Sequence, residues 1–502
     1  MKKFGKSILS LSAAAILASS ALAGCGGTEG SKVVTGDVEA IPYDGSKVTV
    51  VLYHTMGEAL ENILKNHLDK TFYKMYPNIT VSVKKQGDYD GIKEQISNEL
   101  TANNAPSIAY CYPDHVALYN IGKAVLPLDD FIASTDTVTA KKVDGSGEEQ
   151  VQIGFTQAQI DDFYPAYYEE GKSFGDGKMY TLPVMKSTEL MYYNKTYFEE
   201  NEFENEFDFD QPFTWDQLEA LCREVLEYEK SQKHQCIPLG YDSEANWFIT
   251  MCEQLKTPYT SSEAGKNIIF NDERNHAFVK EFSQWYADGL VTTKELSGGY
   301  TSSLFVADEN KGELKSYINI GSSAGAGYQK PEKYENGEYP FEVGITSIPQ
   351  ADFNNKKVIS QGPSLCLFKK ADKQEMAAAW LVAKFITTTV ELQAAWSLNN
   401  GYMSALQSVM DNSVYAGRLA KANGYTHVQE LSIKKSIEQS ENYYVSPAFH
   451  GSSEARDQVG VLMQQCFTKY AKATDKDAFI KDIFDSTIKS IKTQYPNCFS
   501  KA

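Results

Sequence analysis

The chain alternates strand and helix patterns from about residue 47 onward, and this order restricts its fold more than any other feature. Residues 47–53 are rich in β-branched side chains, as in a buried strand, and residues 57–75 place apolar side chains at helical spacing. A second strand over 79–84, a helix over 89–102 and a third strand over 106–112 follow. A β-α-β-α-β order predicts an α/β fold with a mostly parallel sheet.

The same alternation continues to the C-terminus. A capping box of Thr214 and Gln217 predicts the start of a helix near residue 214. The polar, Gly- and Asp-rich residues 134–154 predict a surface excursion. We further expect strands over 180–183, 190–193, 314–320 and 341–345, and helices over 244–255, 275–290, 373–385, 456–470 and 477–491.

The N-terminus has the composition of an export signal. Lys2, Lys3 and Lys6 precede an apolar run from Ile8 to Ala23 that is too short and too rich in small residues to span a bilayer. We therefore expect residues 1–24 to be a signal peptide that is removed from the mature protein.

The end of that run, Leu22-Ala23-Gly24-Cys25, resembles the bacterial lipobox. The resemblance implies that Cys25 becomes the lipid-modified N-terminus, and two or more acyl chains make membrane anchoring stable. An ordinary signal peptide cleaved near Ala23 is the alternative. Residues 25–46 are rich in Gly, Ser, Thr and acidic residues, which is typical of a flexible tether.

The composition limits the partners of the chain. The net charge is −18, and removal of the three lysines of the signal makes the remaining chain about −21. Such an acidic protein repels nucleic acid and anionic lipid headgroups, so we expect no nucleic-acid partner. No later apolar run approaches 18 residues, so we expect no membrane span after the signal.

Seven cysteines remain beside Cys25, and an odd number cannot all pair. A chain of this length needs no disulfide framework, so we expect mostly free and buried thiols. A pair of Cys222 with Cys236, or of Cys236 with Cys252, stays open. The 31 tyrosines offer aromatic faces with hydroxyl tips, which suit sugar binding.

Several short motifs, in this order, resemble the extracellular solute-binding lipoproteins of ABC importers, the family that includes the maltose-binding protein. The resemblance covers nearly all of residues 47–490. Its motifs are Tyr76-Pro77-Asn78, Ala105-Pro106-Ser107, the segment 122–129, Lys178 to Pro183, Leu190 to Lys195, Phe213-Thr214-Trp215-Asp216, Val343 to Pro349, Ala377 to Trp380 and Asn400-Gly401-Tyr402.

The resemblance implies two hinged α/β lobes with a ligand cleft between them, the fold of periplasmic binding proteins. Lobe one would comprise residues 45–186 and 347–398, and lobe two residues 187–346 and 399–502. The segments 186–189 and 347–355 would form the hinge. The family implies that the lobes close over a small solute. Closure changes the shape of the protein, and the membrane subunits of an ABC permease recognise that shape.

Ligands of such lobes bind beyond the carboxyl ends of parallel strands. This rule places His54 after the first strand and Tyr112, Asp114 and His115 after the third. Tyr112 could stack on a sugar ring, and Asp114 could accept hydrogen bonds from sugar hydroxyls or cap a helix. The alternative for both histidines is a structural role.

The resemblance also assigns residues of the second lobe to the cleft. Glu244 and Trp247 match a loop that carries an acid and aromatic residues, and Trp247 is the best single stacking candidate, with helix packing as its alternative. Ser322 and Ser323 stand where many relatives carry a Trp, and their amides and hydroxyls could form a hydrogen-bonding nest. Tyr402 and Arg456 match positions of late contacts.

We expect a monomeric binding protein, not an enzyme, that is anchored outside the cell membrane and captures a mono- or oligosaccharide. The sequence contains no G-x-S-x-G, H-E-x-x-H or P-loop motif, and its histidines lack the spacing of a metal site. We accordingly expect no catalytic residue, metal or cofactor. A surface receptor or adhesin on the same fold, and a binder of a phosphorylated polyol or an amine, remain the alternatives.

Overall fold

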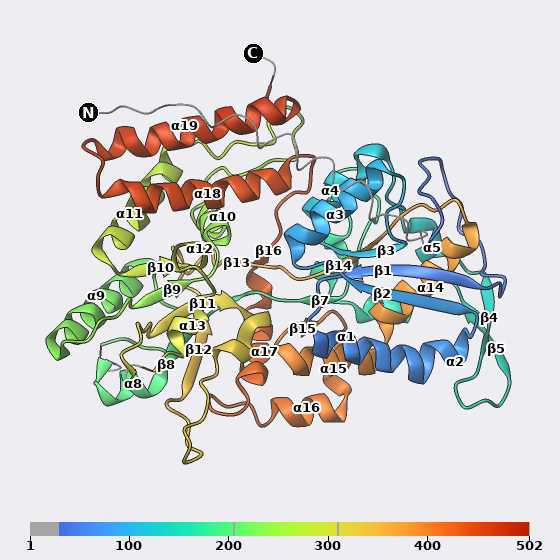
Figure 1. Ribbon diagram of the computed structural model, residues 1–502, viewed down its shortest axis with the longest axis horizontal. Coiled ribbons are helices and arrows are strands. Elements are labelled where there is room, and N and C mark those ends of the chain that lie inside the picture. The colour runs from blue at the N-terminus through green and yellow to red at the C-terminus, as the bar shows by residue number, and fades with distance from the viewer. Residues whose placement is uncertain (1–29, 204–205, 309–310, 501–502) are drawn as a thin grey trace, which may run out of the picture.

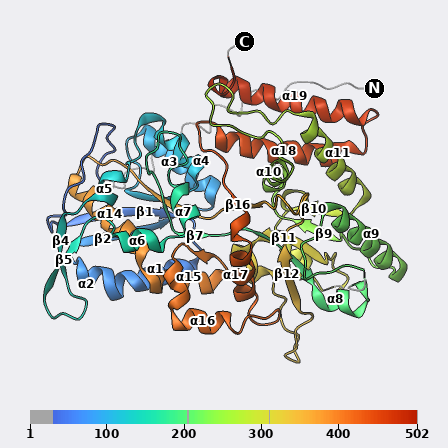
Figure 2. The ribbon, with the colours of Figure 1, turned by 180° about the vertical axis from the view of Figure 1, so that it is seen from behind.

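The computed structural model describes residues 30–203, 206–308 and 311–500. The signal peptide expected over 1–24 and Cys25, the residue expected to carry lipid, lie outside the described residues. Figures 1 and 2 show two bodies side by side, each built on its own sheet, which we call the first and the second lobe. The predicted α/β fold class with two lobes is confirmed.

The sheet of the first lobe has five strands in the order β2-β1-β3-β14-β6. Strand β1 lies in the interior of the sheet, where it pairs in parallel with both β2 and β3, and its last five residues are all buried. Strand β14 is antiparallel to both β3 and β6, so β14 alone is reversed and the other four strands run in one direction, as expected for a mostly parallel sheet. The strands are β1 (Val48–His54), β2 (Ile79–Lys85), β3 (Ile108–Cys111), β6 (Leu182–Pro183) and β14 (Ser364–Leu367).

The sheet of the second lobe repeats this plan in the order β10-β9-β11-β8-β12. Strand β9 is parallel to β10 and β11, whereas β8 is antiparallel to β11 and β12. Each sheet therefore combines a parallel part with an inserted antiparallel strand. The strands are β8 (Glu189–Asn194), β9 (Leu239–Tyr241), β10 (Val291–Thr293), β11 (Ile318–Ser322) and β12 (Val343–Ser347).

Long helices cover the two sheets. The predicted capping box is present at the start of α9, where Gln217 N–H donates to Thr214 Oγ1 at 3.1 Å and Thr214 N–H donates to Gln217 Oε1 at 2.8 Å. The helices of the first lobe include α1 (Glu58–His67), α3 (Tyr89–Thr101), α4 (Pro113–Tyr119), α7 (Pro165–Glu170), α14 (Lys373–Thr388) and α15 (Val390–Asn400). Those of the second lobe include α9 (Trp215–Gln232), α10 (Glu244–Leu255), α11 (Glu273–Asp288), α18 (Ser452–Tyr470) and α19 (Lys476–Gln494).

Shorter helices complete the lobes. The single helix expected over 57–75 is interrupted after α1 by the π-helical turn Leu68–Phe72 and resumes as α2. None of the helices in the described ranges is long and apolar enough to cross a membrane. The remaining helices are α2 (Tyr73–Met75), α5 (Asp129–Ala133), α6 (Gln157–Asp162), α8 (Lys195–Glu200), α12 (Lys294–Ser297), α13 (Ser302–Phe305), α16 (Ser413–Leu419) and α17 (Val428–Glu438).

Residues 134–154 lie at the surface, as expected, and have regular structure. They form a β-hairpin of β4 (Thr137–Lys141) and β5 (Glu148–Gln152), whose strands pair antiparallel. Val138 and Ala140 point inward along β4 and are buried, while their neighbours are exposed. This short alternation within a polar segment is the signal of a strand, and the many polar residues around it concealed the pattern.

The chain passes between the lobes through short paired strands. β7 (Met185–Lys186) pairs with β15 (Met403–Ser404), and β13 (Val358–Ile359) pairs with β16 (Tyr443–Tyr444). These four strands lie between the two bodies in Figure 1. We call the segments that contain them the crossing segments.

Each lobe has its own core. Residues 348, 358 and 359 pack in the core of the second lobe, whereas buried residues between 405 and 433 pack in the core of the first. We therefore propose that the chain changes lobe near residues 187, 362 and 440, which differs from the expected changes near 347 and 399.

The cysteines of the described residues are all free, as expected for most of them. Neither of the two disulfides left open, Cys222 with Cys236 or Cys236 with Cys252, is formed. Burial raises the pKa of the Cys222 and Cys236 thiols, so both are protonated and unreactive at neutral pH.

Candidate functional site

A pocket with an empty volume of about 670 Å³ lies between the two lobes, next to the crossing segments. Residues from both lobes line it, so a change in the angle between the lobes changes its shape. The lining residues are Tyr112, Pro113, Asp114 and Glu170 from the first lobe, Ile249, Tyr259, Thr260, Ser452 and Arg456 from the second, and Ile359 to Gly362 and Tyr444 to Pro447 from the crossing segments.

The wall from the first lobe begins at the carboxyl end of β3, as the sequence predicts. Tyr112 is the residue before α4, and its ring stacks on that of Tyr89 with the centroids 4.1 Å apart. Asp114 lies in the first turn of α4, where its Oδ1 accepts from the N–H of His115 at 2.9 Å. The half-buried Tyr112 and Asp114 thus offer the pocket an aromatic surface and a carboxylate.

The opposite wall carries a cation. Arg456 lies near the start of α18, and its Nη2 donates to Asn246 Oδ1 on α10. Burial by itself would lower the pKa of Arg456, but the charge of the Asp114 carboxylate and smaller contributions from Tyr259, Tyr112 and Tyr444 together outweigh burial, so this pKa is raised. Arg456 stays charged, and the two charged groups face each other from different lobes.

A buried ion pair stands at the first-lobe side of the pocket. Lys186 Nζ, on β7, binds Glu170 Oε2 on α7, and both side chains are less than 5% exposed. Lys186 Nζ also lies 3.5 Å from Ser364 Oγ. Glu170 lines the pocket, and its charge is balanced by Lys186. The pocket is therefore nearly neutral, with Asp114 and Arg456 as its other charges.

Two buried tyrosines on the second-lobe side were not predicted from the sequence. Tyr259 follows α10, and Tyr444 belongs to β16, where its hydroxyl lies 2.7 Å from Thr250 Oγ1. Both residues are less than 10% exposed. Apolar ring surface together with hydroxyl groups is typical of pockets that bind polar organic solutes.

Both predicted histidines lie behind the pocket wall. His54 is fully buried, its Nδ1 accepts from the N–H of Met56 at 3.0 Å, and burial lowers its pKa to about 4. His115 is buried against Tyr112, with the ring centroids 5.4 Å apart, and burial lowers its pKa as well. Neither lines the pocket, because each side chain points into the first lobe and packs there.

Trp247 also lies in a different place from the cleft position expected for it. It is fully buried in the core of the second lobe, where it stacks on Tyr241 at 4.7 Å with nearly parallel rings. Glu244, one turn earlier on α10, is buried and accepts from the hydroxyl of Thr293. These contacts correspond to the alternative of helix packing, and neither residue lines the pocket.

The other predicted residues stand apart from the pocket. Ser323 Oγ accepts from the N–H of Thr188 at 3.2 Å, and Ser322 Oγ accepts from the N–H of Ala324 at 3.3 Å, so both hydroxyls serve the local backbone. Tyr402 is half-buried beside Tyr89, and burial raises its pKa to about 12. Of the ten predicted ligand residues, the structure brings Tyr112, Asp114 and Arg456 together in the pocket.

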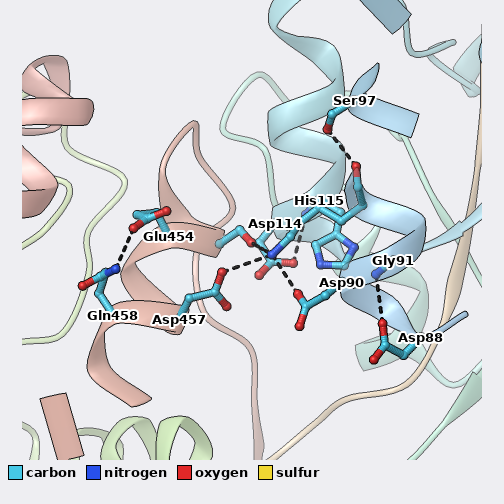
Figure 3. Close-up of polar contacts among 11 residues, drawn as sticks. Asp88, Asp90, Gly91, Ser97, Asp114, His115, Glu454, Asp457 and Gln458 are labelled. Atoms are coloured by element: carbon cyan, nitrogen blue, oxygen red, sulfur yellow. Dashed lines mark hydrogen bonds and ion pairs between the residues drawn. The ribbon is translucent and has the colours of Figure 1, made fainter. Parts of the chain in front are cut away.

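An ion pair joins the lobes beside the pocket. Lys93 Nζ on α3 lies 3.1 Å from Asp457 Oδ2 and 3.3 Å from Ser453 Oγ, both on α18, and 2.9 Å from Asp90 Oδ1 on its own helix. Figure 3 shows Asp90 and Asp457 directed toward the same amine from opposite lobes. The turn of α18 that carries Arg456 is therefore attached to the first lobe.

The described residues contain no group of three His, Cys, Asp or Glu side chains suited to hold a metal ion. What the pocket offers is an aromatic face, hydroxyl groups, a carboxylate and a guanidinium. Groups of these kinds suit a small polar solute, which they could hold by stacking and hydrogen bonds.

Several solved structures share this fold. A binding protein for cyclic α-maltosyl-1,6-maltose from Arthrobacter globiformis superposes with a TM-score of 0.63 at 16% identity, covering 89% of this chain and 100% of its own. A substrate-binding protein from Listeria monocytogenes in complex with cycloalternan gives 0.67 at 15% identity, covering 90% and 100%. A Mycobacterium tuberculosis protein in complex with glycerophosphocholine gives 0.63 at 12% identity, covering 89% and 98%.

These identities establish the fold and leave the solute open. Among curated proteins, none matches the chain at a significant level. The sequence profile of the bacterial extracellular solute-binding proteins matches residues 67–422, which is well over half of the chain. This chain belongs to the bacterial extracellular solute-binding protein family.

Proposed function

We propose that the protein captures a small neutral solute, a mono- or oligosaccharide, and delivers it to the membrane subunits of an ABC permease. The observation that carries this proposal is the pocket between the lobes, where Tyr112 offers a ring face and Asp114 and Arg456 stand on opposite walls. A carboxylate and a guanidinium can each hold two neighbouring hydroxyl groups of a sugar.

The balance of charge favours a neutral ligand. Glu170 is neutralised by Lys186, and Asp114 is opposed by Arg456. A neutral solute that bridges Asp114 and Arg456 leaves no uncompensated charge in the closed pocket, whereas burial of an unpaired charge is costly. Such a solute draws the two walls together, because it contacts both of them only when the lobes are closed.

A phosphate-bearing solute is the second candidate. Arg456 is the one cation among the residues that line the pocket in the described chain, and a guanidinium binds phosphate oxygens in a bidentate manner. One protein of the same fold was solved with glycerophosphocholine. The nearby Asp114 carboxylate opposes this candidate by repulsion, so we rank it below a carbohydrate.

The lipobox-like segment that ends at Cys25 supports a further proposal, that the protein is retained at the membrane. We propose that the mature protein begins at Cys25, carries acyl chains there and functions as a monomer outside the cell membrane, with residues 25–46 as its tether. Mass spectrometry of the membrane-extracted protein tests this: an acylated Cys25 at the N-terminus supports it, and an N-terminus near Gly24 without lipid contradicts it.

The solute class is tested by a thermal-shift panel on the purified protein. The panel contains neutral mono- and oligosaccharides, sn-glycero-3-phosphocholine, inorganic phosphate and simple amines. A ligand at 100 times its Kd adds about 2.7 kcal/mol to the free energy of unfolding, which is readily detected. Stabilisation by a sugar, recovered chemically unchanged, supports the proposal; stabilisation by phosphate compounds or amines alone contradicts it.

A further inference from the structure

Behind the pocket, a buried chain of polar contacts leads from the crossing segments to Arg456. Glu189, the first residue of β8, is 1% exposed, and its Oε1 accepts from Asn246 Nδ2 at 2.7 Å. Asn246 is 4% exposed, and its Oδ1 accepts from Arg456 Nη2. Asn246 thus links the buried carboxylate directly to the guanidinium that lines the pocket.

The partners fix the orientation of the Asn246 amide. An ionised carboxylate only accepts hydrogen bonds, and a guanidinium only donates them. The Nδ2 group must therefore face Glu189 and the Oδ1 atom must face Arg456. Gln361, on the crossing segment, reinforces this orientation because its Oε1 accepts from Asn246 Nδ2 at 3.2 Å. In the reversed orientation, the amide would direct N–H groups at Arg456 and oxygen at Glu189.

We propose that Asn246 and Glu189 are positioning residues for the ligand-binding pocket: Glu189 fixes the amide of Asn246, and that amide holds Arg456 toward the solute. This inference rests on the proposed function, in which the pocket binds a solute. It assigns a role to two buried side chains that do not themselves line the pocket. Glu189 and Gln361 belong to the segments where the chain changes lobe. The orientation of the Arg456 guanidinium is therefore coupled to the conformation of these segments.

The protonation of Glu189 controls this arrangement. Burial raises the pKa of Glu189 to about 7, although hydrogen bonds from Tyr241 and Asn246 and the charge of Arg456 lower it in part. Asp242, directly after β9, raises this pKa further, and the hydroxyl of Tyr444 also interacts with the carboxyl. A protonated Glu189 gains an O–H donor and no longer requires Nδ2 of Asn246 to face it. We therefore expect the hydrogen bond of Arg456 to Asn246 to be maintained above about pH 7 and to be lost below it.

Guanidinium NMR of the ligand-free protein tests the arrangement directly. The chain has only four arginines, Arg223, Arg274, Arg418 and Arg456, and the variant Arg456→Lys identifies the signals of Arg456. In the wild type, we expect these signals to shift with a midpoint near pH 7, from a rotationally restrained state at pH 8 to a freer one at pH 6.

Three variants separate this mechanism from a general effect of burial. In Glu189→Gln, a side-chain amide can donate to Asn246 Oδ1, so Arg456 should show its low-pH signals at every pH. Tyr241→Phe removes a hydrogen bond from the carboxylate at 2.6 Å and should move the midpoint upward. Glu253→Gln is the matched control, because Glu253 is another acid on α10 with a pKa raised by burial and should leave the titration unchanged.

Binding of maltotriose and of sn-glycero-3-phosphocholine, measured at pH 6 and pH 8, provides the second readout. For whichever probe binds, we expect Glu189→Gln to weaken binding about tenfold at pH 8 and to abolish the difference between the two pH values. The inference is overturned if Arg456 titrates in Glu189→Gln as it does in the wild type. It is also overturned if Glu189→Gln binds the probe with the Kd of the wild type at both pH values. If neither probe binds, the NMR result still decides whether Glu189 and Asn246 position Arg456. The absence of binding then counts only against the proposed solutes.

Discussion

Lys93 of α3 and Asp457 of α18 form an ion pair of 3.1 Å that joins the two lobes one residue away from Arg456. The Lys93 side chain is 18% exposed and that of Asp457 is 48% exposed. Burial by itself lowers the pKa of Lys93, but Asp457 and Asp90 outweigh it and raise this pKa, whereas burial raises the pKa of Asp457. The attraction is thus partly offset by desolvation, and the pair contributes a modest free energy to the contact between the lobes.

The first prediction concerns this pair. The variant Lys93→Met should weaken solute binding about three- to fivefold, equivalent to about 1 kcal/mol, because it removes an attraction that exists only when the lobes are together. Calorimetry at low and high salt checks this, because the higher affinity of the wild type over Lys93→Met should mostly disappear at high salt. Lys481→Met is the control, because the pair of Lys481 with Asp485 lies within α19. Equal effects of both variants would refute the role of Lys93.

The second prediction concerns Tyr112. Replacement by Ala should weaken binding by about 1–3 kcal/mol, the range of aromatic anchors, with little change in the unfolding temperature because the side chain is only half-buried. Titration calorimetry and a melting curve measure the two effects. Tyr328→Ala, at a tyrosine that is 77% exposed on the second lobe, should change neither. An affinity that is the same in Tyr112→Ala and the wild type would remove Tyr112 from the site.

The third prediction separates Trp247 from the pocket. Trp247→Ala should lower the free energy of unfolding by about 3–5 kcal/mol, because it leaves a cavity between Tyr241 and Phe282 in the second core. The fraction that remains folded should bind solute with nearly the affinity of the wild type. Urea unfolding and calorimetry on the same sample distinguish the two effects. A loss of affinity without a loss of stability would show that Trp247 contacts the solute in the cleft.

The fourth prediction follows from His54. Its pKa falls from an ordinary value of 6.5 to about 4 in the folded protein because of burial. The unfolded chain therefore binds a proton that the folded chain does not, and stability is lost as the pH falls from about 6.5 to about 4. This loss should amount to about 2–3 kcal/mol.

In His54→Asn, an amide oxygen can still accept from the N–H of Met56, but the residue no longer titrates. Urea unfolding at several pH values should therefore give this variant a smaller loss of stability between pH 6.5 and pH 4 than the wild type. An identical pH dependence of the two proteins would show that His54 is not responsible.

The sequence predicted the elements well where periodicity was strong. Helix α10 begins and ends at the predicted residues 244 and 255, and β1 and β2 lie within one residue of their predicted bounds. It also predicted Tyr112 and Asp114, because the rule for carboxyl ends of strands depends only on strand order. Which face of a helix meets the pocket depends instead on packing between distant segments.

Trp247 and Asn246 illustrate this limit. They are adjacent on α10 and point about 100° apart, so one side chain enters the core while the other meets Arg456. The position of α18 against α10, which is far away in the sequence, decides which of the two side chains enters the core and which contacts Arg456. Lys186 and Glu170 are a similar case, since a lone lysine in the apolar segment 184–186 signals a buried partner without naming it.

The most direct test of the account is the dissociation constant of the sugar selected by the thermal-shift panel, measured by calorimetry for the wild type and for the double variant Tyr112→Ala/Arg456→Ala. We expect one sugar molecule to bind each wild-type protein and the double variant to bind about 100-fold more weakly, because it loses a contact on each wall of the pocket. Unchanged affinity in a folded double variant would show that the solute binds elsewhere and would contradict the account.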